Sequence, residues 1–185
     1  MRHVGPIVLV AIFVTFSVTF YFISPDDILN VVGVENAYLL MFVLALLGGL
    51  STFSGVPYHL ILVGLASGGL DPWLLGLIAA GGVMTGDSTS YLLGKRGSEL
   101  LSARMMTVLT KLKVVEERVP RLMPVVYFLY GACVPLSNDI LVIPAGLIGY
   151  PFWRIMLPLG LGNVVFNVGL ALVAVYATGY VAVFL

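Results

Sequence analysis

The sequence predicts an all-α, polytopic integral membrane protein with a single membrane domain over residues 1–185, and three observations lead to this fold class. Apolar residues make up 60% of the chain and charged residues only 10%, whereas soluble domains carry roughly 25% charged residues. Three uninterrupted apolar runs are long enough to cross a hydrocarbon core of about 30 Å as helices. Most basic residues gather in one stretch between such runs, as is typical of cytoplasmic loops.

The composition also limits the function. Nine basic and nine acidic residues balance each other, which gives no reason to expect nucleic-acid binding. Cys133 is the only cysteine, so no internal disulfide can form. The sequence has no Cys/His cluster with metal-ligand spacing and no glycine-rich phosphate loop, so we expect neither a metal nor a cofactor.

The first half of the chain begins with an apolar run over residues 4–23, which no small-x-small cleavage site follows. We interpret it as a retained transmembrane helix rather than a signal peptide. Apolar sequence resumes over residues 37–70 but breaks at "GGLSTFSGVP". Each half then has 14 residues and a helical length of about 21 Å, too short to cross alone. The next run, residues 72–93, is long enough to cross.

The second half repeats this order after a charged connector. Residues 94–121 contain seven of the nine basic residues, and their apolar residues recur at helical spacing, which predicts an amphipathic connector at the cytoplasmic face. Residues 122–150 are again apolar but break at "GACVPLSND", and residues 155–185 can cross the membrane.

The broken segments 37–70 and 122–150 could each be a re-entrant hairpin or a kinked crossing. Hairpins place the N-terminus, with Arg2, and the 94–121 loop on the cytoplasmic side, whereas full crossings place Arg2 outside. We therefore expect two re-entrant helical hairpins plus about three full transmembrane helices. Irregular backbone at membrane depth is tolerated where it is buried in protein or lines a wet cavity, so the two breaks predict an internal site.

An internal repeat supports this organisation. A shift of 80 residues superimposes His59 on Asp139, Gly69 on Gly149, Trp73 on Trp153, Gly82 on Gly162, and Asp87 on Asn167. The chain is expected to cross once between the two copies, which inverts the second relative to the first. Interrupted segments at matching positions of inverted halves are typical of transporters, whose site lies at the interface of the halves.

The segment "GDSTSYLLGKRG", residues 86–97, resembles the G-D-x-x-x-Y-x-x-G-(R/K)-x-x-G signature of DedA/VTT (SNARE-associated Golgi protein-like) membrane proteins. The segment "VPYHLILVGLASGG" is similar to that family's first re-entrant motif, and "VPLSNDILVIPAGLIGYPFW" to its second. The resemblance covers roughly residues 48–180. The motif residues are Pro57, Gly86, Tyr91, Gly94, Gly97, Pro135 and Gly146, with Gly97 one residue earlier than the last glycine of the signature.

This resemblance implies two facing membrane-embedded hairpins and a role in lipid translocation. Bacterial members are associated with polyprenyl-phosphate carriers, and eukaryotic relatives with phospholipid scrambling. The present chain has His59 where many bacterial members have a glutamate, and Ala132 and Asn138 where they have arginines. Such arginines would pair with a lipid phosphate, so their absence weighs against an anionic carrier.

Asp87 is a candidate functional residue because an ionisable side chain within an apolar segment costs a few kcal/mol. The alternative is a structural carboxylate that the hydroxyls of Ser88, Thr89 or Ser90 satisfy. Asp139 and His59 flank the two breaks and could form a polar pair that binds a headgroup or carries a proton. For Asp139, the alternative is a helix N-cap.

Three asparagines and several surface residues complete the candidate set. Asn138, Asn163 and Asn167 could line the path or only form hydrogen bonds between helices; bonding is favoured for Asn163, and lining is favoured for Asn167 because it matches Asp87 in the repeat. Lys95 and Arg96 could contact lipid headgroups. Trp73 and Trp153 are expected to anchor the hairpin ends at the membrane interface.

The sequence therefore predicts a membrane lipid transporter that moves phospholipid or polyprenyl phosphate, with proton coupling through a carboxylate or His59. The alternatives are a small-solute or ion transporter of the same architecture and a non-transporting membrane-organising protein. Ser54 and His59 raise the idea of an intramembrane hydrolase, but nothing else supports that pairing, so we expect no enzyme activity. We expect the partners to be membrane lipids and the location to be a prokaryotic cell membrane. The chain could also form homo-oligomers.

Overall fold

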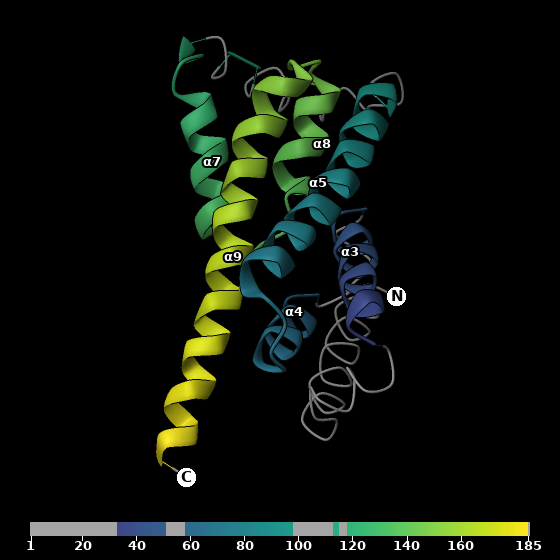
Figure 1. Cartoon of the computed structure of the whole chain (residues 1–185). Helices are drawn as coiled ribbons and strands as arrows, with labels where there is room; N and C mark the ends of the chain where they lie inside the picture. The colour runs from purple at the N-terminus through teal and green to yellow at the C-terminus, as the bar shows by residue number, and fades with distance from the viewer. Residues whose placement is uncertain (1–32, 51–57, 98–112, 115–117, 185) are drawn as a thin grey trace, which may run out of the picture.

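The computed structural model describes residues 33–50, 58–97, 113–114 and 118–184, and these residues form six α-helices and no strand. The all-α prediction is thereby confirmed for this part of the chain. The predicted helix 4–23 and most of the connector 94–121 lie outside the described residues. The helices, shown in Figure 1, are α3 (Val34–Leu50), α4 (Tyr58–Ser67), α5 (Pro72–Gly97), α7 (Met123–Cys133), α8 (Asp139–Leu147) and α9 (Phe152–Phe184).

The described helices differ in length, and only the longer ones have the length to cross a membrane alone. Helix α9 contains the apolar stretch Phe152–Ala177, which among the described helices is the one long and apolar enough to cross a membrane. Helix α5 has 26 residues and is about 39 Å long, but it carries Asp87 and two basic residues in its last turn. Helices α4, α7 and α8 have 10, 11 and 9 residues, so none of them can cross alone.

The long helices extend slightly beyond their predicted bounds. Helix α5 continues from the predicted end at residue 93 to Gly97, because Lys95 and Arg96 in its last turn complement the negative end of the helix dipole. Helix α9 begins at Phe152 rather than residue 155, directly after Pro151, which is suited to a helix start.

The short helices pack in a crossed arrangement. Helix α5 lies against α3, α8 and α9, while α9 also lies against α7 and α4 (Figure 1). The second short helix of each half therefore packs mainly on the long helix of the other half: α4 on α9, and α8 on α5. This exchange places the two halves in contact along both long helices.

The repeat is visible in the way α4 and α8 end. Each helix is followed by a glycine with positive φ, Gly69 at 91° and Gly149 at 72°. The N–H of Gly69 donates to the Ala66 carbonyl, and the N–H of Gly149 donates to the Gly146 carbonyl. The next residue donates five residues back, from Leu70 to the Leu65 carbonyl and from Tyr150 to the Ala145 carbonyl, which completes a Schellman motif that requires the left-handed conformation. Both halves therefore turn from short helix to long helix by the same device.

Two apolar cores hold the helices together. One core joins α3 and α4 to the first half of α5 and the second half of α9, reaching Val83 on α5 and Ala171 on α9. The other joins α7 and α8 to the remaining parts of the long helices, reaching Tyr91 on α5 and Leu159 on α9. One segment of each long helix therefore lies between the two cores.

Candidate functional site

The segment between the two cores is polar. Asp87 lies on α5 between Val83 and Tyr91, and Asn163 and Asn167 lie on α9 between Leu159 and Ala171. Asn138, which directly precedes α8, reaches the same place. We call Asp87, Asn138, Asn163 and Asn167 the polar layer. All four side chains are buried, with Asp87 only 1% exposed and Asn167 fully covered.

Asn138 ties the polar layer together. Its Nδ2 donates to Asp87 Oδ2 at 2.7 Å and to Asn163 Oδ1 at 3.2 Å. Asn167 Nδ2 donates to the Asn163 backbone carbonyl at 2.8 Å. One amide from the second broken segment therefore links the two long helices, which originate from different halves of the chain.

Two atoms of the layer keep hydrogen-bonding capacity. Among the described residues, Asn163 Nδ2 and Asn167 Oδ1 are buried and have no hydrogen-bond partner. Leaving a buried polar atom unsatisfied costs about 1–3 kcal/mol, and such atoms are uncommon in folded proteins. Both amides lie beside other polar groups, with Asn163 next to the Asp87 carboxyl group and Asn167 next to the Tyr58 hydroxyl, so this donor and this acceptor belong to a polar interior.

The first broken segment approaches the layer through the start of α4. The Tyr58 side chain faces that of Asn167. The His59 ring packs edge-on against Phe166 of α9, with ring centroids 5.4 Å apart, and lies 3.8 Å from the Tyr58 ring. Both breaks therefore end beside the polar layer, one at Tyr58 and one at Asn138.

Asp139 is the first residue of α8 and is 4% exposed. The N-cap interpretation of Asp139 is wrong by one position, because Asn138 occupies the cap. The Asn138 side chain makes no capping bond and binds Asp87 instead. Asp139 contributes a carboxylate to the first turn of α8, where the helix dipole favours negative charge. Its backbone N–H donates to Ser137 Oγ at 3.3 Å.

The hydroxyls that follow Asp87 have other partners. Ser88 Oγ donates to the Met84 carbonyl and Thr89 Oγ1 to the Thr85 carbonyl, both one turn back on α5. Ser90 Oγ donates to the last carbonyls of α3. The alternative in which these hydroxyls satisfy Asp87 therefore finds no support in the described hydrogen bonds.

The glycines of the sequence signature allow close helix packing. A Cβ at Gly86 would lie 2.6 Å from the Leu46 carbonyl oxygen of α3, and a Cβ at Gly94 would lie 2.5 Å from the Ile143 carbonyl oxygen of α8. Gly146 of α8 meets the α5 backbone at Tyr91 in the same way. Gly97 has ordinary space around it, with its nearest neighbour atom at 3.9 Å.

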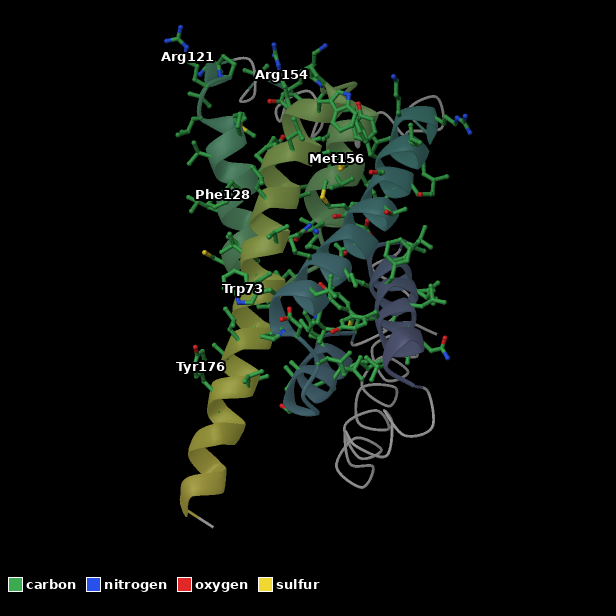
Figure 2. The ribbon with its side chains drawn as sticks, in the orientation of Figure 1. Trp73, Arg121, Phe128, Arg154, Met156 and Tyr176 are labelled. Atoms are coloured by element: carbon green, nitrogen blue, oxygen red, sulfur yellow. The ribbon has the colours of Figure 1, made fainter. Side chains whose placement is uncertain are left out.

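The remaining motif residues are placed as follows. The Tyr91 hydroxyl donates to the Tyr150 backbone carbonyl, which fixes the turn after α8. Pro135 lies in the break between α7 and α8, while Pro57 and Ser54 fall outside the described residues. Lys95 and Arg96 end α5, at the end of the molecule where Figure 2 shows Arg121 and Arg154.

Sequence reasoning found three of the four layer residues through their polarity within apolar segments. It favoured structural bonding for Asn163, which does accept a hydrogen bond from Asn138 and also keeps a buried donor. Tyr58 was not singled out; its position next to the break was the available signal. In the described part of the chain, no three His, Cys, Asp or Glu side chains come together to hold a metal ion.

Comparison with known proteins gives one match. A family model, the VTT domain, matches residues 56–177. No curated protein and no solved structure matches the chain. The matched region includes both short helices that bring the breaks to the polar layer.

Proposed function

Since the chain belongs to the VTT-domain family of membrane proteins, we propose that it is a lipid transporter that moves a phospholipid headgroup across the membrane by way of the polar layer. The observation that carries the proposal is the position of this layer. It lies between two apolar cores on both long helices, and both chain breaks end beside it. Buried polar residues at the interface of two repeated halves are typical of transporter sites.

The proposed topology consists of two re-entrant hairpins, α3 with α4 and α7 with α8, that enter from opposite sides. The basic end of the molecule, with Lys95, Arg96 and Arg121, would face the cytoplasm of a prokaryotic cell. In a Cys133→Ser background, single cysteines in the 26–35 connector and in the 68–71 turn should both react with an impermeant thiol reagent added outside cells. Labelling from opposite sides would show that the first segment crosses the membrane.

The chemistry of the layer favours some substrates over others. It presents one carboxyl group and three amides, with the Asp139 carboxyl group close enough to Asp87 to act on it electrostatically. No basic side chain belongs to the layer. Acidic and amide groups bind ammonium and hydroxyl groups better than phosphate. We therefore favour a phospholipid whose headgroup carries an amine or hydroxyls over a polyprenyl phosphate, with Asp87 or His59 as the proton-coupling group.

The test uses purified protein in liposomes that contain a fluorescent phosphatidylethanolamine, whose exposure to the outside is measured by chemical quenching. Asp87→Asn keeps the shape but removes the ionisable carboxyl group, and should slow translocation by about tenfold or more, the size expected for losing a hydrogen bond to an ionisable group. The matched control is Thr85→Val, because Thr85 lies on the exposed side of the same helix and bonds only its own turn. Thr85→Val should move lipid at the normal rate.

Two results would refute the proposal. Liposomes with intact protein could show no lipid movement with or without a proton gradient. Alternatively, Asp87→Asn could lower thermal stability while leaving translocation unchanged, as expected of a membrane-organising protein. A small-cation transporter is the second candidate, favoured by the adjacent carboxyl groups of Asp87 and Asp139. Uptake of a cation by the same liposomes, without lipid movement, would identify it.

A further inference from the structure

A cavity of about 270 Å³ lies where α8 turns into α9. Its wall is formed by residues 148–151 of the turn, Pro120, and two cationic side chains, Lys113 and Arg154. None of the lining residues is acidic. The volume is several times the share of one water molecule, which is about 30 Å³, so the cavity can hold a group of phosphate size with its substituents. Figure 2 shows Arg154 at the end of the molecule where Arg121 also lies.

The wall of the cavity is held in place by backbone bonds. Gly149 adopts the left-handed conformation and closes the Schellman motif of α8, with the Tyr150 N–H bound to the Ala145 carbonyl at 2.9 Å. The Tyr150 carbonyl in turn accepts the Tyr91 hydroxyl from α5. Arg154 belongs to the first turn of α9, and its N–H donates to the Pro151 carbonyl. The turn is therefore a rigid wall that presents the arginine next to a helix start.

The repeat shows what this turn does in the other half of the chain. A shift of 80 residues places Asp71 on Pro151 and Leu74 on Arg154. Asp71 Oδ1 accepts the Leu74 N–H at 2.7 Å, so the first turn of α5 is capped by its own carboxylate. In the second half a proline replaces that carboxylate, and two cations stand beside the cavity instead. The turn before the long helix therefore carries a capping carboxylate in the first half, and lies beside a cavity with two cationic residues in the second half.

We propose that this cavity binds the phosphate group of an anionic ligand at the membrane surface, and that the ligand is the headgroup of an anionic phospholipid. Arg154 offers several donors in a planar fork that suits phosphate oxygens, and Lys113 adds a second positive charge. Trp153, which is 65% exposed beside Arg154, suits the interfacial depth at which headgroups lie. This inference concerns binding and does not depend on transport through the polar layer.

The experiment measures thermal stabilisation of the detergent-solubilised full chain by three soluble probes: dihexanoyl phosphatidylglycerol, dihexanoyl phosphatidylcholine and inorganic phosphate. Phosphatidylglycerol should stabilise the protein most. Combined Lys113→Gln and Arg154→Gln should weaken its apparent affinity by about 20- to 30-fold, since each charge near the surface contributes about a fivefold effect. The matched control is Arg118→Gln with Arg121→Gln, which removes two exposed cations that do not line the cavity.

A second variant tests the comparison between the halves. Pro151→Asp would supply the carboxylate that Asp71 supplies to α5, so it should keep or raise thermal stability while abolishing stabilisation by phosphatidylglycerol. If inorganic phosphate at equal concentration stabilises the protein as much as phosphatidylglycerol does, the ligand is a free phosphate ion and the assignment to a lipid headgroup is wrong. The proposal is overturned if no probe stabilises the protein, if the Lys113→Gln/Arg154→Gln variant binds phosphatidylglycerol as the unmodified chain does, or if the Arg118→Gln/Arg121→Gln control loses as much affinity as that variant.

Discussion

Gly82 and Gly81 are neighbours on α5 with different surroundings, and their substitution by alanine gives a matched test of helix packing. An added Cβ at Gly82 would lie 2.5 Å from the Phe42 carbonyl oxygen and 2.9 Å from the Ala45 Cβ of α3. An added Cβ at Gly81 would meet no atom within 4 Å. A methyl group can therefore be added to one face of α5 freely, and to the other only by moving α3.

The magnitude follows from these distances. Ordinary contacts begin at 3.4 Å, so Gly82→Ala forces α3 and α5 apart by about 0.9 Å. Overpacking of this kind costs about 1–3 kcal/mol. Both substitutions stabilise the helix by up to about 1 kcal/mol, because alanine has a higher helix propensity than glycine. This contribution cancels when the two variants are compared. For a chain of this size 1 kcal/mol corresponds to about 2–4 °C, so Gly82→Ala should unfold about 2–12 °C below Gly81→Ala.

The assay is thermal unfolding of the purified variants in one detergent, followed by far-UV circular dichroism. Equal unfolding temperatures for the two variants would refute the close α3–α5 contact. The repeat supplies an independent second pair, because a Cβ at Gly162 would lie 2.4 Å from the Phe128 carbonyl oxygen, whereas Gly169 has nothing within 4 Å. Gly162→Ala should therefore also unfold below Gly169→Ala.

Two further substitutions test the turns that join short and long helices. Asp71→Ala removes the N-cap of α5 and should cost about 1 kcal/mol in thermal unfolding, whereas Asp71→Asn should cost much less because asparagine caps equally well. A loss of equal size in both variants would argue against capping. Tyr91→Phe leaves the buried Tyr150 carbonyl without its donor and should cost about 1–3 kcal/mol, while Tyr176→Phe, at a residue 66% exposed, should be neutral.

The order of helices could be predicted because it depends on local properties of the sequence. Broken apolar runs reveal short helices through their length, and this prediction holds for α4, α7 and α8. The repeat could also be found, because Gly69 and Gly149 occupy a backbone position that favours glycine in both halves. The exact helix ends could not be predicted, since Asp139 and its neighbour Asn138 are both good capping residues and only the tertiary structure selects between them.

The contacts within the polar layer could not be predicted from the sequence. Their formation depends on how closely the helices cross, and the crossing of α5 and α8 is set by Gly94 and Gly146 on facing backbones. Sequence spacing says that Asp87 and Asn138 are polar residues in apolar surroundings, but not that the amide of one reaches the carboxyl group of the other. The same limitation applies to the Tyr91 hydroxyl, whose partner is a backbone carbonyl 59 residues away.

The positions at which the two halves differ indicate where the chemistry of the site, rather than helix packing, determines the residue. Gly82 and Gly162 match because both crossings need the same close approach. Asp87 corresponds to Asn167, and a second aspartate there would place another carboxyl group in the same buried layer. Burying one ionisable group within a membrane already costs a few kcal/mol, and like charges nearby add to that cost. An amide at residue 167 keeps the hydrogen-bonding groups of the layer while limiting its charge. The repeat therefore supplies the architecture of the fold, and the differences between its halves supply the polarity of the layer.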